Sequence, residues 1–579
     1  MIHESKFSVA ANLILYSLLF FPFLILPEAL FSQSNPDAEE RPNIIFILLD
    51  DTGFSDIGSY GSEISTPHID QLAYGGLRFN HAESRAICSP SRAALLTGRN
   101  SQSVGMMDLA GYDQGGYSHS LGYVTPKAGT IAEILKLKGY RTLMTGKWHL
   151  VPMSQMWNSE EGKASTQENW PLQKGFDDFY GWLSGWTDQY NPKGIGQRMI
   201  EGNRPAREMN PGGAHVSEQI VNKAIDYLEA GFEQNQGRPQ FLYLSFGATH
   251  APIQVPKQYI DRYDGMYDIG WDRLREERFA RQRRIGIIPE NAVLTDRHPE
   301  DPQWESLTKV EKTVYSEFME TYAGFMEHTD AQIGKLIDYL KQTGEYDNTI
   351  IILTSDNGAA PEAGVEGNFA HPYGGIMSVG EMFGELDKLG TEESQPLYQR
   401  PWARVGSTPF KKYKLWPHAG GVRVPFIVSW PRKIQGVGAI RPQYVEMIDV
   451  APTVMDVLQI ETPDEIDGIP QMPVHGESFA DLFSNPDAKT RSTQFYLMRG
   501  SRAIYHEGWK AIAFHERGTP FEEDRWELYD TKKDFSESND LAEEQPEKLE
   551  QLKALWWSEA ERYGALPLVE FQPPWLNDD

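Results

Sequence analysis

The stretch Asn43-Ile-Ile-Phe-Ile-Leu-Leu49-Asp50-Asp51-Thr52-Gly53 decides the fold of this chain. Its continuous apolar run is typical of a strand that is buried on both faces of a sheet. Asp50 and Asp51 follow at the carboxyl end of this strand, where open α/β sheets place their ligands. For this fragment alone, a solvated Asx turn is the alternative interpretation.

A second stretch, Thr349-Ile-Ile-Ile-Leu-Thr-Ser355, repeats the pattern and ends in Asp356-Asn357-Gly358. Adjacent carboxylates repel each other unless a cation or a proton compensates their charge. Carboxylate and amide oxygens suit Ca²⁺ or Mg²⁺ and do not suit zinc. Two strands that end in matching oxygen clusters therefore predict a divalent metal site.

The single cysteine, Cys88, lies in the segment His81-Ala-Glu-Ser-Arg-Ala-Ile-Cys-Ser-Pro-Ser-Arg-Ala-Ala-Leu-Leu-Thr-Gly-Arg99. A lone cysteine cannot form an intramolecular disulfide, and packing is its usual use. Here Pro90 and Ser91 suit a turn that enters a helix, and Arg92, one turn on, is expected close to the sulfur. An electropositive helix N-terminus of this kind activates a nucleophile and holds an anion.

The residues Cys88-Ser89-Pro90-Ser91-Arg92, followed by Leu96-Thr97-Gly98-Arg99, resemble the signature of the type I sulfatases. Residues 267–289, a basic helical insertion, together with Trp304 and Tyr322 resemble the bacterial arylsulfatase branch of that family. The resemblance implies that a separate maturation enzyme oxidises Cys88 to formylglycine, an aldehyde whose hydrate is the nucleophile. It also implies a Ca²⁺ site, with Mg²⁺ as the lesser alternative, formed by Asp50, Asp51, Asp356, Asn357 and the modified residue 88.

Three further segments carry basic residues that the resemblance assigns to the site. Gly146-Lys147-Trp148-His149 follows an expected strand at 140–144, and an extended chain would point Lys147 and His149 to one side. His250 follows an apolar strand at 239–245, and Lys414 precedes Gly420-Gly421-Val422-Arg423. Lys411 and Lys412 are the alternatives to Lys414. Ala419 and Ser407 stand where the family usually has Glu and Asn.

The family mechanism then implies a role for each of these residues. Asp356 helps to remove the proton of the attacking hydroxyl, and Arg92 and Lys147 stabilise the charge around residue 88. His250, with Lys414, protonates the departing oxygen. His149 takes the proton of the second hydroxyl, which expels sulfate and restores the aldehyde.

The composition and the N-terminal segment limit the partners and the cellular location that we expect for this protein. The net charge of −28 argues against a nucleic-acid partner. Lys6, the apolar run from Leu13 to Leu26 and the small polar residues up to Ser34 predict a signal peptide over residues 1–34, with an N-terminal anchor as the alternative. We therefore expect an exported protein, periplasmic or secreted, without stable membrane insertion after the signal is removed.

The expected fold class is α/β. The resemblance implies an alkaline-phosphatase-like α/β/α sandwich with a large mixed sheet over residues 41–462, the catalytic domain. The patterns after a Pro- and Gly-rich boundary predict a smaller C-terminal domain, residues 475–579, of antiparallel sheet and helix. Residues 359–406, which include His371, are expected to form a long loop over the site. The aromatic-rich residues 175–190 either stack on a sugar or aryl ring or pack internally.

Three hypotheses for function remain open from the sequence. The first is a sulfatase that hydrolyses aryl sulfates or sulfated carbohydrates. The second is a phosphatase or phosphonate monoester hydrolase of the same superfamily. The third is a catalytically inert binding protein on this fold, and the intact set of metal, nucleophile and basic residues argues against it.

Overall fold

The computed structural model describes residues 41–111, 116–156, 166–194, 196–208, 210–234, 238–370, 375–434 and 436–570. The predicted signal peptide and His371 lie outside this range. In the part of the chain that is described, no helix is long and apolar enough to span a bilayer.

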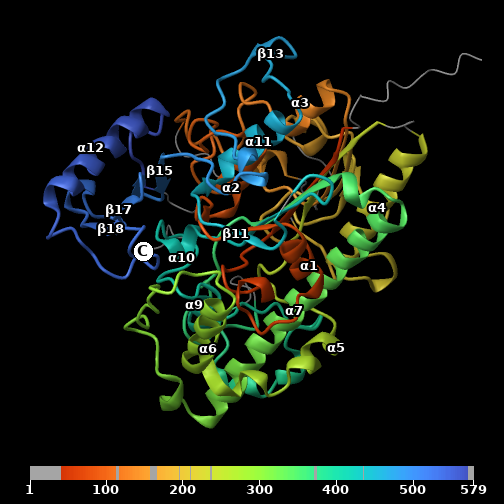
Figure 1. The fold of residues 1–579 in the computed structure, drawn as a ribbon. Coiled ribbons are helices and arrows are strands. Elements are labelled where there is room, and N and C mark those ends of the chain that lie inside the picture. Colours follow the sequence, from red (N-terminus) through yellow and green to blue (C-terminus); the bar gives the residue numbers. More distant parts are fainter. Residues whose placement is uncertain are drawn as a thin grey trace, which may run out of the picture. The chain divides into compact units, whose positions relative to one another are not determined.

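A ten-stranded mixed sheet forms the centre of the fold (Figure 1). Its order is β11-β2-β10-β9-β1-β8-β4-β5-β6-β7, and the five strands from β9 to β5 run parallel. The strands are β1 Asn43–Leu49, β2 Leu77–Phe79, β4 Arg141–Lys147, β5 Asp178–Trp182, β6 Ile200–Glu201, β7 Arg204–Pro205, β8 Gln240–Ser245, β9 Thr349–Ser355, β10 Phe426–Ser429 and β11 Ala439–Arg441.

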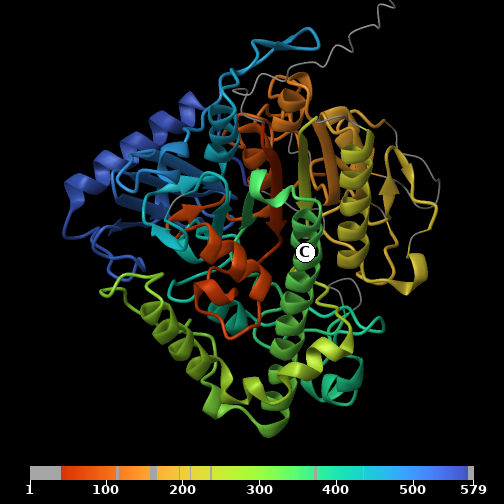
Figure 2. The same cartoon turned by 45° about the vertical axis from the view of Figure 1, so that its right-hand side comes forward.

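Helices cover both faces of this sheet, and alternate residues of β1 show why. Ile45 and Ile47 pack into one core with α1, α4 and α7, whereas Ile44 and Phe46 pack into a second core with α2, α3 and α11. In Figure 2 the long helix α7 runs beside α4 on the first face. The predicted burial of β1 on both faces is confirmed.

The helices are α1 Pro67–Gly75, α2 Cys88–Thr97, α3 Ile131–Leu137, α4 Val216–Gln234, α5 Lys257–Ile260, α6 Gly270–Arg284, α7 Lys309–Gln342, α8 Val379–Phe383, α9 Arg400–Gly406, α10 Ala419–Val422, α11 Val450–Val457 and α12 Pro546–Arg562.

The C-terminal region forms a separate antiparallel sheet with one helix, as the sequence predicts. The strands β15 Thr493–Met498, β16 Ser501–His506, β17 Trp509–Ala513 and β18 Trp526–Asp530 follow one another in order, and α12 packs on one face through Leu552 and Trp556. The other face places Tyr496 and Ile512 against the segment Ala86–Cys88 that enters α2. The small sheet therefore supports the start of α2. Short strand pairs complete the chain: β3 Ala82–Glu83 with β12 Val445–Glu446, and β13 Glu465–Ile466 with β14 Ile469–Pro470.

One sequence expectation about helices needs correction. Residues 359–406 are not one long loop, because they contain α8 and α9; Ser378 and Glu381 cap the start of α8 reciprocally. The basic helix α6 packs against the loop after β1 through a buried arginine. Its Arg278 is buried and donates to Asp56 over 2.5 Å, and Asp56 accepts from the backbone N–H of Gly53 over 2.9 Å. Helix α6 thus braces the loop that follows β1.

Candidate active site

Three carboxylates meet at the carboxyl ends of the neighbouring parallel strands β1 and β9. Asp50 and Asp51 follow β1, Asp356 follows β9, and one oxygen of each lies within 4.8 Å of the others. Asn357 joins them by donating from Nδ2 to Asp51 Oδ1 over 2.6 Å. All four side chains are buried. Parallel pairing of the two strands brings these residues together.

This cluster fits a hard divalent cation. Asp50 Oδ1 and Asn357 Oδ1 are buried, and neither accepts a hydrogen bond from any described residue. Burial, reinforced by Asp356, raises the pKa of Asp50 to about 7. Unsatisfied buried oxygens and crowded carboxylates are costly in isolation, and carboxylate and amide oxygens are the ligands that Ca²⁺ and Mg²⁺ prefer.

Each carboxylate is also paired with a buried cation. Arg92, in α2, donates to Asp356 Oδ2 from Nε over 2.9 Å and from Nη2 over 2.7 Å. Lys147, the last residue of β4, lies with Nζ 2.5 Å from Asp50 Oδ2. Lys414 Nζ lies 2.9 Å from Asp51 Oδ2. The site therefore combines a cluster of carboxylates that can bind a metal ion with three cationic side chains that can bind an anion.

Cys88, the first residue of α2, lies at the edge of this cluster. Its Sγ is 3.3 Å from His149 Nδ1, and its side chain is buried. The expected activation of the thiol is wrong for the unmodified residue: burial, the largest effect, raises the pKa of Cys88 to about 11 despite Lys147 and Lys414. The Arg92 guanidinium donates to Asp356, to Ser245 Oγ and to the carbonyl oxygen of Lys147, and these contacts fix Asp356 in the cluster.

Several site residues adopt a left-handed backbone conformation, which costs of order 1–3 kcal/mol for a residue with a side chain. Asp51 and His149 have φ values of 60° and 54°, and Leu415, the neighbour of Lys414, has 77°. The chain at His149 is therefore not extended, contrary to the expectation from the spacing of Lys147 and His149. The surrounding structure holds the turn, because Ser89 Oγ donates to the carbonyl oxygen of His149 over 2.9 Å.

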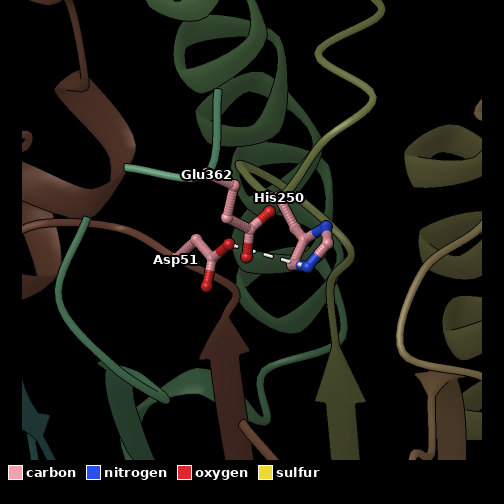
Figure 3. A group of neighbouring side chains, drawn as sticks. All are labelled: Asp51, His250 and Glu362. Carbon is pink, nitrogen blue, oxygen red and sulfur yellow. Dashed lines mark ion pairs between the residues drawn. The ribbon is translucent and has the colours of Figure 1, made fainter. Parts of the chain in front are cut away.

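His250 and Glu362 complete the site, as Figure 3 shows. His250 follows β8 and places Nε2 3.7 Å from Asp51 Oδ2. Glu362, on the segment that leaves β9, lies with Oε1 2.6 Å from Lys414 Nζ. Sequence reasoning missed Glu362. The signal that could have found it is its position six residues after Asp356, on the continuation of the same motif.

The structure thus brings the predicted residues into one site and separates them from their alternatives. Lys411 turns away to Glu527, with Nζ 3.2 Å from Oε2, and Lys412 lies over the ring of Trp416. In residues 175–190, Phe176, Phe179, Tyr180 and Trp182 are buried in the two cores, which supports internal packing for them. The residues brought together are Asp50, Asp51, Cys88, Arg92, Lys147, His149, His250, Asp356, Asn357 and Lys414.

Comparison with known proteins agrees with this arrangement. A family model described as Sulfatase matches residues 42–460, and one described as N-sulphoglucosamine sulphohydrolase, C-terminal, matches residues 411–560. Among solved structures, the Ps i-CgsB complex with k-i-k-neocarrahexaose has a TM-score of 0.61 at 23% identity, covering 90% of this chain and 93% of that one. This likeness confirms the predicted alkaline-phosphatase-like fold class.

Two curated relatives span most of both chains. An uncharacterized sulfatase of Schizosaccharomyces pombe is 31% identical and covers 90% of this chain and 94% of its own length. An arylsulfatase of Klebsiella aerogenes is 32% identical and covers 79% of this chain and 95% of its own length. The predicted recognition is confirmed: the chain belongs to the sulfatase family, whose members hydrolyse sulfate esters.

Proposed function

We propose that this protein is an exported, formylglycine- and calcium-dependent sulfatase that acts on aryl sulfates or sulfated carbohydrates. The observation that carries the proposal is the position of Cys88, at the edge of three buried carboxylates and three buried cations. The name of the Klebsiella aerogenes relative supports an aryl sulfate, and the oligosaccharide in the Ps i-CgsB structure supports a carbohydrate.

Asp50, Asp51, Asp356 and Asn357 would hold the metal ion, with residue 88 beside them. A bound Ca²⁺ supplies positive charge that neutralises the sulfate oxygens. Formylglycine at position 88 would supply, as its hydrate, one hydroxyl as the nucleophile and a second hydroxyl whose deprotonation expels sulfate and restores the aldehyde. A plain cysteine or serine ester lacks that second hydroxyl.

The three cations bind and orient the anionic part of the substrate. Lys147 lies against Asp50, Arg92 against Asp356 and Lys414 against Asp51, so the three cations surround the carboxylate cluster. These side chains are buried, so their charges act in a medium of low dielectric and are already in place before the reaction. We assign them to stabilising the charge on sulfate oxygens as the ester bond breaks.

Two histidines are placed to move protons. Burial, with Lys147 adding to it, holds the pKa of His149 well below its ordinary value, so the ring is neutral and can accept a proton near residue 88. His250 Nδ1 lies 2.6 Å from the carbonyl oxygen of Ala251 and therefore donates to it. Its Nε2, on the side of Asp51, is the nitrogen that would pass a proton to the departing oxygen.

The test is anion release from a panel of aryl sulfates, sulfated oligosaccharides and aryl phosphates, run with the Cys88→Ala variant alongside. We expect sulfate release by the unmutated protein alone. Mass spectrometry of the peptide that contains residue 88 should show the aldehyde in active preparations. Phosphate as the dominant product, or equal turnover by the variant, would replace the sulfatase proposal with a metal-centred phosphatase.

A further inference from the structure

A second basic pocket lies next to the Lys414 segment. It encloses about 390 Å³ and is lined by residues 293–299, Arg404, Lys411, Lys412, Tyr413 and Ser538. Lys412 is two residues before Lys414, so their Cα atoms lie at most about 7 Å apart. The pocket is therefore adjacent to the candidate active site but is built from different side chains.

Arg404 is a buried cation of this pocket that lacks an acidic partner. Its side chain is 6% exposed, and Nη2 donates to the carbonyl oxygen of Thr295 over 3.1 Å. Its Nε is buried and makes no hydrogen bond, and the guanidinium forms no ion pair, with any residue in the described ranges. Burial lowers the pKa of Arg404 to about 10, although Asp301 and Asp272 act in the opposite direction.

Arg275 adds a second buried charge behind the first. It donates to Thr295, and its Nη2 also donates to the carbonyl oxygen of Phe410 over 2.9 Å, so its described partners are neutral. Burial, with Arg404 adding to it, lowers the pKa of Arg275 well below its ordinary value. Two guanidinium groups thus converge on the oxygens of Thr295, and neither forms an ion pair with a carboxylate in the described ranges.

Lys412 contributes the third cation. Its Nζ lies 3.7 Å from the centre of the Trp416 ring, and it forms no ion pair with a described residue. By contrast, Lys411 is paired with Glu527, and Arg297 with Asp272 at 3.4 Å. The lining carboxylate, Asp296, is exposed to solvent. Arg404 and Lys412 therefore have no ion pair in the described ranges, and Asp301 and Asp272 act on Arg404 from beyond ion-pair distance.

We propose that this pocket binds an oxyanion group, a sulfate or carboxylate, held by Arg404 and Lys412. Guanidinium and ammonium donors recognise such oxygens through charge-assisted hydrogen bonds, and a bound anion would offset the cost of the buried cations. The protein carries a net charge of −28, so its overall field repels anions, and a second local cluster gains importance for that reason.

The oxyanion has two sources. It is either a second anionic group of the substrate, whose first sulfate is bound at Lys414, or free inorganic sulfate. The first form rests on the proposed sulfatase function and deepens it, because it makes the preferred substrate a multiply charged molecule.

The experiment compares kcat/KM for two otherwise identical oligosaccharides that carry one sulfate or two. The quantity compared is kcat/KM for the oligosaccharide with two sulfates divided by kcat/KM for the one with a single sulfate. We expect Lys412→Gln to lower this ratio by about tenfold and Arg404→Gln to lower it as well. Lys553→Gln is the matched control, because Lys553 pairs with Glu550 on the surface of α12, and it should keep the wild-type ratio. Lys412 is partly exposed, so its variant gives a result even if the Arg404 variant does not fold.

A second measurement separates the sources of the anion. Inorganic sulfate should raise the Tm of the wild type more than that of Lys412→Gln. If Lys412→Gln reduces the rise in Tm that sulfate causes but leaves the ratio of the two kcat/KM values unchanged, the occupant of the pocket is free sulfate. If neither quantity differs among the wild type, both pocket variants and Lys553→Gln, the pocket binds no oxyanion and the proposal is overturned. If the wild type hydrolyses no sulfate ester while the Tm effect still depends on Lys412, the pocket stands and the proposed function falls.

Discussion

Lys414 Nζ lies 2.9 Å from Asp51 Oδ2, although 363 residues separate the two in the chain. Glu362 Oε1 accepts from the same ammonium group over 2.6 Å. The lysine is thus fixed between one carboxylate of the candidate metal site and one carboxylate of the segment that leaves β9. Its position is set before any substrate arrives.

Replacing this lysine should cost more activity than replacing the residue that positions it. We expect Lys414→Gln to lower kcat/KM for an aryl sulfate by about 100-fold, because one preorganised cation is lost. Glu362→Gln should cost about tenfold. Since Glu362 acts through Lys414, the double variant should be barely worse than Lys414→Gln. Losses that multiply in the double variant would show that Glu362 acts independently.

Removal of the divalent metal should abolish turnover and lower thermal stability. Asp50, Asp51 and Asp356 repel one another when no cation lies between them, and a ligand that binds the folded state alone stabilises it. Activity and Tm are measured before and after EGTA treatment and dialysis. We expect Ca²⁺ to restore both better than Mg²⁺, since Ca²⁺ tolerates irregular coordination. Full activity in the metal-free protein would exclude the metal site.

Gly146 should tolerate no side chain. Its φ is +102°, and a Cβ atom there would lie 1.8 Å from the carbonyl oxygen of Ser245, in the neighbouring strand β8. Gly146→Ala should push apart β4 and β8 just before Lys147 and cost more than about 3 kcal/mol. The control is Gly344→Ala, where φ is +78° and nothing lies within 4 Å. It should cost about 1 kcal/mol, from backbone strain alone. Equal urea midpoints for the two variants would contradict this account.

His475 should make the protein less stable as the pH falls. Burial, with Arg99 adding to it, lowers the pKa of His475 to about 3, and Nδ1 accepts a hydrogen bond from the backbone N–H of Asn100. The unfolded chain binds this proton near pH 6.5, whereas the folded chain does not until about pH 3. The free energy of unfolding therefore falls as the pH decreases between these values, by up to about 5 kcal/mol.

The measurement for this prediction is urea unfolding at several pH values from 7 down to 4. His475→Gln keeps an acceptor oxygen but cannot be protonated in this range, so its stability should depend less on pH than that of the wild type. An identical pH dependence in both proteins would assign the acid sensitivity to other groups.

The sequence by itself determined that two strands are buried on both faces of a sheet and which residue types follow them. Runs such as 43–49 and 349–355 have no polar face, so they had to be buried on both sides of a sheet. Their terminal residues, Asp50 and Asp356, had to lie at the same edge once the strands were parallel. The resemblance around Cys88 then pointed to the family that the comparisons confirm. The predicted domain boundaries at residues 462 and 475 and the predicted export stay predictions.

Only the tertiary structure decided which side chains contact one another and how their surroundings shift their pKa values. Lys411, Lys412 and Lys414 are alike in sequence, and their separation depends on a backbone turn with positive φ at Lys412 and Leu415, which no residue type there announces. Glu362 became a site residue because of its contact with Lys414, a pairing over 52 positions. The raised pKa of Cys88 likewise comes from burial under the C-terminal sheet. Such contacts join distant parts of the chain, so they follow from packing and not from any local pattern.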